Sequence, residues 1–150
     1  MNAPLQQPVH VRISSTPAHL PVVRAAIEKM CEQLGFDAET AGNVVLSVDE
    51  ALTNVIRHAY EDDPSQPIEI ALAPFDSPNV RGLRIQLRDY GKQVDPAKIK
   101  SRDLADVRPG GLGVHIMNEC MDSVEFTAAE GGGTLLTLIK NLPSEQEAAK

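Results

Sequence analysis

One long amphipathic segment, residues 37–60, constrains the fold of this chain more than any other stretch. The segment DAETAGNVVLSVDEALTNVIRHAY has helical spacing, and Asp37 is a suitable N-cap residue for it. On a helical wheel one wide arc is apolar throughout and consists of Val44, Val48, Ala51, Leu52, Val55 and Ala59. Because an arc of this width has to be buried, the segment predicts a second layer of structure packed along it.

A second arc of the same predicted helix is polar and consists of Ser47, Glu50, Asn54, Arg57 and His58. Asparagine is unfavourable inside a helix, because its side chain competes for backbone hydrogen bonds. Asn54 also follows Glu50 by about one turn, and this spacing directs both side-chain oxygens to one point. Mg²⁺ prefers oxygen ligands, so the pair favours a hydrated divalent cation. The alternative is that the polar arc is only a solvated helix flank.

The rest of the sequence alternates between strand-like and helix-like patterns. Alternating apolar and polar residues predict strands at 9–14, 68–74 and 82–90, and a terminal hairpin that turns at Gly131–Gly133. Three further helices are predicted. One covers residues 21–34 and ends at Gly35, a short one covers residues 97–105, and one begins at Gly111. Together they predict one α+β domain over residues 1–150, with an ordered core at about 8–142.

The charge balance limits the partners that this chain can have. Its formal charge is −7, and no basic stripe is available to neutralise a nucleic-acid backbone. A nucleotide is still compatible, because backbone N–H groups and a metal can hold its phosphates. No apolar run is long enough to span a membrane and the N-terminus lacks a signal-peptide layout, so we expect a cytoplasmic protein. Cys31 and Cys120 are expected to be buried thiols.

One of two glycine-bearing segments indicates an anionic ligand. Gly110, Gly111 and Gly113 lead into a predicted helix, where free N–H groups and the positive end of the helix dipole would face an anion. Asp89 and Gly91 follow a predicted strand, and by themselves they would indicate no more than a turn.

Four motifs follow one another in the chain: E-x-x-x-N on a helix, D-x-G after a strand, G-G-L-G at a helix start and G-T before the last strand. This order resembles the nucleotide-binding domain shared by gyrase-type ATPases, Hsp90, histidine kinases and MutL. Within this group the resemblance is strongest to the short bacterial anti-sigma serine kinases, and it covers nearly the whole chain. The segments that carry it are LSVDEALTNVIRHAY, RDYGKQVDP and PGGLGVHIMNECMDSVEF. The resemblance implies a Bergerat-type two-layer α/β sandwich, with a mostly antiparallel sheet and about three helices on one face. One position departs from the pattern: Gln93 stands where D-x-G-x-G has its second glycine.

The resemblance also implies a role for each site residue. Glu50 would accept the proton of an attacking hydroxyl, and Asn54 would coordinate Mg²⁺. Asp89 would accept a hydrogen bond from the adenine amino group of ATP, and Gly91 would give the base room. The other nucleotide contacts that the resemblance implies come from Gly111, Leu112, Gly113, Val114 and Thr134.

Two further assignments concern the first helix and the segment 91–111. The resemblance implies that Arg24 binds protein partners. Segment 91–111 is long and polar and contains two prolines, so we expect a lid that becomes ordered when ATP and Mg²⁺ bind. One basic residue of this lid, Lys100, Arg102 or Arg108, would reach the γ-phosphate.

The function implied by the resemblance is that of an ATP-dependent serine protein kinase and anti-sigma factor. Its expected partners are a sigma factor and a STAS-type anti-sigma-factor antagonist that carries the substrate serine, without nucleic acid or membrane; a homodimer is a further expectation. The first alternative is a nucleotide-binding switch that sequesters a partner without phosphorylating it, and Glu50 argues against that reading. The second is a scaffold that has lost nucleotide binding, which Asn54, Asp89 and Gly113 disfavour.

Overall fold

A computed structural model describes residues 7–91 and 109–143 of the chain, and the side chains of these residues other than 109–112. Five strands form one antiparallel sheet in the order β1-β2-β3-β5-β4. The strands are β1 (Val9–Ser14), β2 (Pro67–Asp76), β3 (Arg81–Asp89), β4 (Ser123–Ala128) and β5 (Thr134–Asn141). The helices are α1 (Leu20–Leu34), preceded by a 3-10 turn (Pro17–His19), then α2 (Ala38–Asn54), a π-helix (Val55–Ala59) and α4 (Pro109–Cys120).

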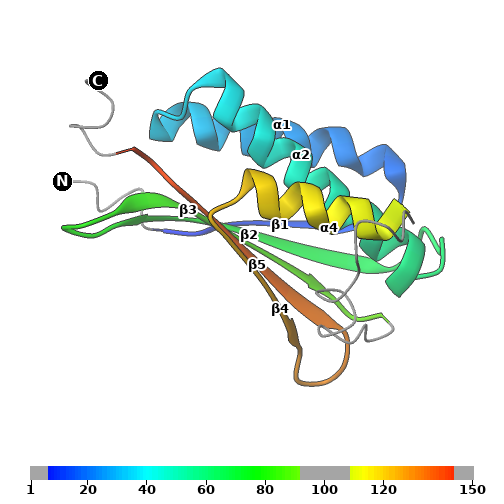
Figure 1. The fold of residues 1–150 in the computed structure, drawn as a ribbon. Helices are drawn as coiled ribbons and strands as arrows, with labels where there is room; N and C mark the ends of the chain where they lie inside the picture. The colour runs from blue at the N-terminus through cyan, green and yellow to red at the C-terminus, as the bar shows by residue number, and fades with distance from the viewer. Residues whose placement is uncertain (1–6, 92–108, 144–150) are drawn as a thin grey trace.

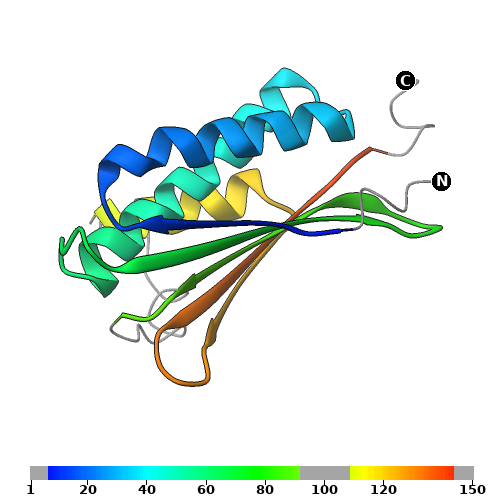
Figure 2. The ribbon, with the colours of Figure 1, turned by 180° about the vertical axis from the view of Figure 1, so that it is seen from behind.

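The helices lie together on one face of the sheet, and within the described residues the other face carries none (Figures 1 and 2). This confirms the predicted α+β sandwich with an antiparallel sheet and three helices on one side. The C-terminal ends of α2 and β3 and the start of α4 lie at the same end of the molecule (Figure 1). Segments far apart in the sequence therefore meet at that end.

Local sequence signals account for the helix ends in the first half of the chain. The Asp37 carboxylate accepts a hydrogen bond from the backbone N–H of Thr40 at 2.7 Å, as predicted for an N-cap. Helix α1 ends at Gly35, whose φ of 92° lies in the left-handed region, and its N–H bonds the carbonyls of Cys31 and Glu32. Both predicted boundaries are confirmed.

The apolar arc of α2 forms the centre of the core. Val44, Val48, Ala51 and Leu52 are all buried there, as predicted, with branched residues of the sheet such as Ile70, Ile85 and Leu138 in the same cluster. The polar arc is not the uniformly solvated flank of the alternative reading. Ser47 is fully buried, and its hydroxyl donates to the Asn43 carbonyl at 2.9 Å. Helix α4 packs against α2 and covers part of this flank.

The predicted helix 37–60 is not continuous, and this corrects the helical wheel. After Asn54 the chain winds as a π-helix, in which the Tyr60 N–H bonds the Val55 carbonyl at 2.9 Å, five residues back. The wider turn shifts every later side chain, so His58 is exposed and no longer follows Asn54 along one face. Val55 and Ala59, predicted in the buried arc, are only partly buried.

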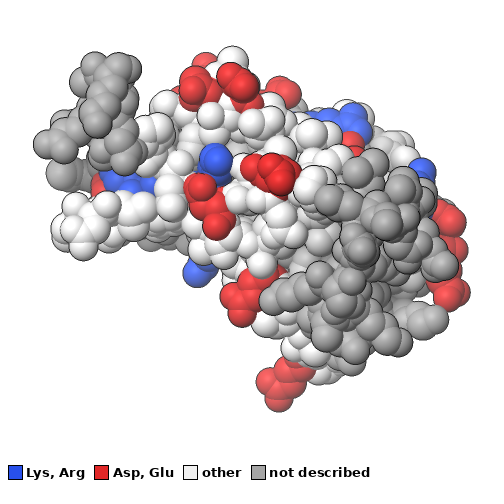
Figure 3. All heavy atoms as spheres, in the orientation of Figure 1, with Lys and Arg blue, Asp and Glu red and all other residues white. Residues whose placement is uncertain are grey.

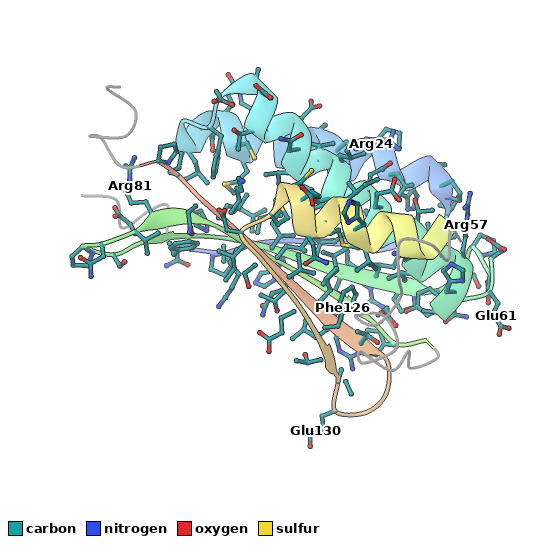
Figure 4. All side chains as sticks on the ribbon, viewed as in Figure 1. Arg24, Arg57, Glu61, Arg81, Phe126 and Glu130 are labelled. Carbon is teal, nitrogen blue, oxygen red and sulfur yellow. The ribbon has the colours of Figure 1, made fainter. Side chains whose placement is uncertain are left out.

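A tight reversal joins this π-helix to β2. Glu61 and Asp62 have φ values of 51° and 66°, the left-handed region that side chains other than glycine seldom adopt. Arg57 and Glu61 project from this end of the molecule (Figure 4).

The described part of the second half of the chain has the predicted elements, but the start of one helix differs. The hairpin of β4 and β5 is confirmed, and each glycine of 131–133 has a φ between 81° and 100°. Helix α4 begins at Pro109, two residues before the predicted Gly111. Proline suits the first position of a helix, because its missing N–H would have no partner there. The predicted helix 97–105, Gln93 and the candidate lid residues Lys100, Arg102 and Arg108 lie outside the described residues.

The two thiols differ in burial. Cys31 is fully buried, as expected, and its desolvation raises the pKa of the thiol to about 11. Cys120, the last residue of α4, is only half-buried, which corrects the expectation of a buried thiol. In the part of the chain that the structure describes, no helix combines the length and apolar character needed to cross a membrane.

Two glycines give a matched test of this fold. Gly35 has a φ of 92° and Gly42 is helical, and an added Cβ would meet nothing within 4 Å at either position. We expect Gly35→Ala to destabilise the protein by about 1 kcal/mol, because alanine disfavours the left-handed conformation. Gly42→Ala should stabilise it by roughly 0.5–1 kcal/mol through higher helix propensity. Urea unfolding of both variants measures the two shifts, and equal signs would contradict the assigned conformations.

Candidate functional site

Helix α4 brings three predicted site residues together. Glu50 and Asn54 lie on the flank of α2 that faces α4, and both are half-buried. A Cβ added to Gly113 would lie 2.9 Å from Glu50 Oε2 and 3.6 Å from Asn54 Nδ2. A side chain at position 113 would therefore displace the Glu50 carboxylate. The acid, the amide and the glycine therefore form one cluster, while Arg57 and His58 remain on the exposed surface.

The start of α4 determines which backbone N–H groups are free. N–H groups of a first helical turn have no intrahelical partner, and here that turn contains Gly110 and Gly111. Gly113 lies beyond that turn, so its close approach to Glu50 accounts for the glycine better than a free N–H would. The Val114 side chain is buried in the core, so its backbone would have to make any ligand contact.

Asp89 is a buried carboxylate at the end of β3, with 4% of the residue exposed. Its Oδ1 accepts the Gly91 N–H at 3.0 Å. Burial raises the pKa of Asp89, whereas the hydrogen bonds from the Gly91 and Thr134 backbones and the nearby Arg88 charge oppose that rise. The carboxylate is thus held in place and poorly hydrated, which suits recognition of a hydrogen-bond donor on a ligand.

Two glycines allow close backbone contacts around Asp89. A Cβ on Gly91 would lie 2.5 Å from the Ala59 carbonyl oxygen, so the D-x-G turn runs directly against the end of the π-helix. A Cβ on Gly133, which has a φ of 81°, would collide with the Asp89 carbonyl. The β4–β5 hairpin therefore presses on the Asp89 backbone and brings buried Thr134 beside it.

Sequence reasoning missed three contributors to this end of the molecule. Gly133 belongs to the G-T motif, but its contact with the Asp89 backbone was not predicted. The Arg88 guanidinium donates hydrogen bonds to the carbonyls of Asp89 and Glu130. These bonds connect the β4–β5 hairpin to the end of β3. The Tyr60 hydroxyl accepts the Tyr90 N–H at 2.8 Å. An aromatic residue at the end of a predicted helix was the one available signal for Tyr60.

Arg24 lies apart from this cluster, on the exposed side of the helical layer (Figure 4). Its Nε is 2.8 Å from Asp49 Oδ1, and 43% of its side chain remains exposed. The ion pair joins α1 to α2 and holds the guanidinium at the surface. Asp49 directly precedes Glu50 in α2, so the Arg24 surface and the Glu50 cluster belong to adjacent residues of one helix.

The described side chains do not form a metal site by themselves. In residues 7–91 and 109–143, no three His, Cys, Asp or Glu residues gather closely enough to bind a metal ion. The Asn54 amide oxygen and the Glu50 carboxylate next to Gly113 nevertheless suit Mg²⁺, which retains waters and binds ligand phosphates alongside one or two protein oxygens.

Asp89 and Asp63 predict opposite pH effects on stability. The folded pKa of Asp89 is raised, so the unfolded chain loses this proton first, and stability falls as pH rises from the ordinary value of 3.8 toward the folded pKa. Hydrogen bonds from Gln66 and Ser65 lower the pKa of Asp63 to about 2, so its contribution is lost as pH falls from 3.8 toward 2.

Removal of each charge separates these effects. Asp89→Asn should gain stability relative to wild type as pH rises, and Asp63→Asn should lose it. Denaturant unfolding at a series of pH values gives both differences. A stability difference for Asp89→Asn that does not change with pH would contradict the desolvated carboxylate.

Comparisons with known proteins agree with this geometry. The family description "Histidine kinase-like ATPase domain" matches residues 13–140. Serine-protein kinase RsbW of Oceanobacillus iheyensis is 24% identical over 146 residues, which cover 92% of this chain and 89% of the relative. Anti-sigma F factor of Anoxybacillus flavithermus is 26% identical over 144 residues, or 92% and 94% of the two chains.

Two solved structures share the fold. One contains the RsbU and RsbW domains of a Mycobacterium tuberculosis protein; it matches with a TM-score of 0.62 and 19% identity, over 92% of this chain and 34% of that one. The other is the SiaB–SiaC complex of Pseudomonas aeruginosa, with a TM-score of 0.62, 13% identity and coverage of 91% and 90%. With the family match over most of its length, this chain belongs to the histidine kinase-like ATPase domain family.

Proposed function

We propose that this chain is an ATP-dependent protein serine kinase that also sequesters a sigma factor. Its protein substrate would be a STAS-type anti-sigma-factor antagonist. The observation that carries the proposal is the cluster of Glu50, Asn54 and Gly113, in which a carboxylate and a side-chain amide lie against the first turns of a glycine-rich helix. Relatives over most of this length are named serine-protein kinase and anti-sigma factor.

In this proposal Asp89 reads the base of the nucleotide. Its buried carboxylate accepts a hydrogen bond from the adenine amino group, beside Gly91 and Thr134. The N–H groups of Gly110 and Gly111 face the phosphates. Asp89→Asn is therefore expected to weaken ATP binding by about 1–3 kcal/mol, opposite in sign to its effect on folding at neutral pH.

Glu50 acts as the general base in the transfer. It takes the proton of the substrate serine as the hydroxyl oxygen bonds the γ-phosphorus, and the bond from that phosphorus to the leaving ADP oxygen breaks. Asn54 is the expected protein ligand of Mg²⁺, which would neutralise charge on the phosphate oxygens. The contribution of the protein is mainly to position these groups, since phosphoryl transfer needs little covalent chemistry from it.

The protein partners would bind on the helical layer around Arg24. Acidic side chains are scattered over the face seen in Figure 3, and Lys and Arg side chains occur there only at separate points. An individual arginine held by Asp49 therefore suits specific contacts better than a broad electrostatic surface would. A homodimer remains a prediction.

Glu50 and Asn54 can be separated by their expected effects. Glu50→Gln should keep ATP binding but lower phosphorylation of the antagonist by roughly 10²–10⁴-fold, because glutamine cannot accept the proton. Asn54→Ala should reduce Mg-ATP binding and phosphorylation together, because a Mg²⁺ ligand is lost. Calorimetry with ATP and Mg²⁺, and phosphoserine detection on the antagonist encoded nearest to this chain, measure the two quantities.

Glu39→Gln is the matched control, since Glu39 is exposed in the first turn of the same helix. It should leave both quantities unchanged. Phosphorylation by Glu50→Gln at the wild-type rate would remove Glu50 as the base. ATP binding without phosphorylation by the wild-type protein would favour a sequestering switch over a kinase.

Arg24 should contribute to partner binding alone. Arg24→Ala is expected to weaken binding of both the sigma factor and the antagonist, with ATP affinity unchanged, because the side chain is remote from Asp89 and half-exposed. Lys29→Ala is the control, since Lys29 forms an exposed ion pair with Glu32 on the same helix at 3.4 Å. Pull-down of both partners at wild-type levels by Arg24→Ala would exclude this surface.

A further inference from the structure

Tyr60 makes two hydrogen bonds that join the end of the α2–π-helix unit to the strands. The residue is 7% exposed, and its hydroxyl donates to the Pro67 carbonyl at 2.5 Å and accepts the Tyr90 N–H at 2.8 Å. Burial, the largest influence, raises the pKa of Tyr60, so the hydroxyl keeps the proton that it donates. One side chain thus links the helical layer, the start of β2 and the residue after β3.

The acceptor of this bond is itself held in place. Asp63 binds the loop before β2 through hydrogen bonds from Ser65 and from Gln66 Nε2, the latter at 2.9 Å. Pro67, the first residue of β2, pairs with Ser14 of β1. The Pro67 carbonyl is therefore a fixed point, and the hydroxyl bonded to it is oriented rather than free to rotate.

The donor to Tyr60 lies inside the turn that presents Asp89. Tyr90 is the middle residue of Asp89–Tyr90–Gly91, and the carboxylate at one end of this turn accepts the N–H at the other end. A Cβ on Gly91 would lie 2.9 Å from the Tyr60 ring, so the ring packs against the turn while the hydroxyl holds its central amide. The direction of the Asp89 carboxylate depends on this turn.

The π-helix places Tyr60 where it can make these contacts. The Tyr60 N–H bonds the Val55 carbonyl, five residues back, so this last turn contains one residue more than an α-helical turn. The extra residue also brings the Ala59 carbonyl against Gly91. π-turns recur at functional sites, and here the turn orients a side chain toward the residue pair proposed to bind the base.

We propose that Tyr60 is a positioning residue that sets the base selectivity of the nucleotide site, by fixing the Asp89–Gly91 turn to the helix that carries Glu50 and Asn54. This inference rests on the proposed nucleotide function. Tyr60 does not contact the base in this scheme; it acts through the orientation of the Asp89 carboxylate. Loss of its hydroxyl would therefore affect recognition of the adenine amino group more than recognition of the phosphates.

The test compares ADP with IDP, which carries a carbonyl in place of the adenine amino group. Calorimetry on the full chain with Mg²⁺ should show that wild type prefers ADP. Tyr60→Phe keeps the ring and removes both hydrogen bonds, so we expect ADP affinity to fall roughly tenfold. IDP affinity should change little, so the ADP:IDP ratio narrows by about the same factor.

Ile27→Val is the control for a purely structural loss. Ile27 lies in α1 with 1% of the residue exposed, and the change removes one buried methyl group from the core. Ile27 belongs neither to the loop before β2 nor to the Asp89–Gly91 turn. Ile27→Val should lower the unfolding midpoint and leave the ADP:IDP ratio at the wild-type value.

Four outcomes would contradict this inference. A wild-type ADP:IDP ratio in Tyr60→Phe, or an equal change of that ratio in Ile27→Val, overturns the positioning role while the proposed nucleotide site stands. A wild-type protein that binds ADP and IDP equally overturns the adenine role of Asp89, and this inference with it. Hydrogen exchange of the wild-type protein gives a test that needs no variant. If the Tyr90 N–H exchanges as fast as an unprotected amide, its hydrogen bond to the Tyr60 hydroxyl is excluded.

Discussion

Close backbone approach at glycine is the constraint on which this end of the molecule depends. At Gly113 helix α4 comes so near to α2 that a methyl group would lie 2.9 Å from the Glu50 carboxylate oxygen. At Gly91 the D-x-G turn lies against the Ala59 carbonyl, and at Gly133 the hairpin lies against Asp89. Three separate segments thus come together because none of them has a side chain at the point of contact. A side chain at Gly91 or Gly133 would meet backbone atoms and force these segments apart, whereas one at Gly113 would first displace the Glu50 carboxylate.

The sheet and most helix ends could be predicted from the sequence, because they follow from short-range patterns. Alternation located β1, and Asp37 and Gly35 marked the ends of two helices through their own local hydrogen bonds and dihedral angles. The π-helix could not be found in this way. A helical wheel continues the same angle per residue, so it placed His58 in line with Asn54 when one wider turn had already rotated it away.

The candidate site likewise contains residues that local sequence patterns predict and residues that they do not. Glu50 and Asn54 were found by their spacing within one helix, and Asp89 and Gly91 by the motif order along the chain. The contributions of Tyr60 and Gly133 depend on contacts with residues 89–91, which are about 30 and 40 positions away in the sequence. No local pattern records such contacts. Asp89 also shows a conflict between stability and binding, because the burial that prepares the carboxylate for a ligand raises its pKa and penalises its charge in the folded chain.

The adjacency of Asp49 and Glu50 bears on communication between the two surfaces of α2. Asp49 holds Arg24 on the outer side of the helical layer, and Glu50 turns toward α4. In the proposed function one side meets the protein partner and the other meets the nucleotide. Because successive side chains of an α-helix point about 100° apart, one turn of α2 is enough to serve both surfaces.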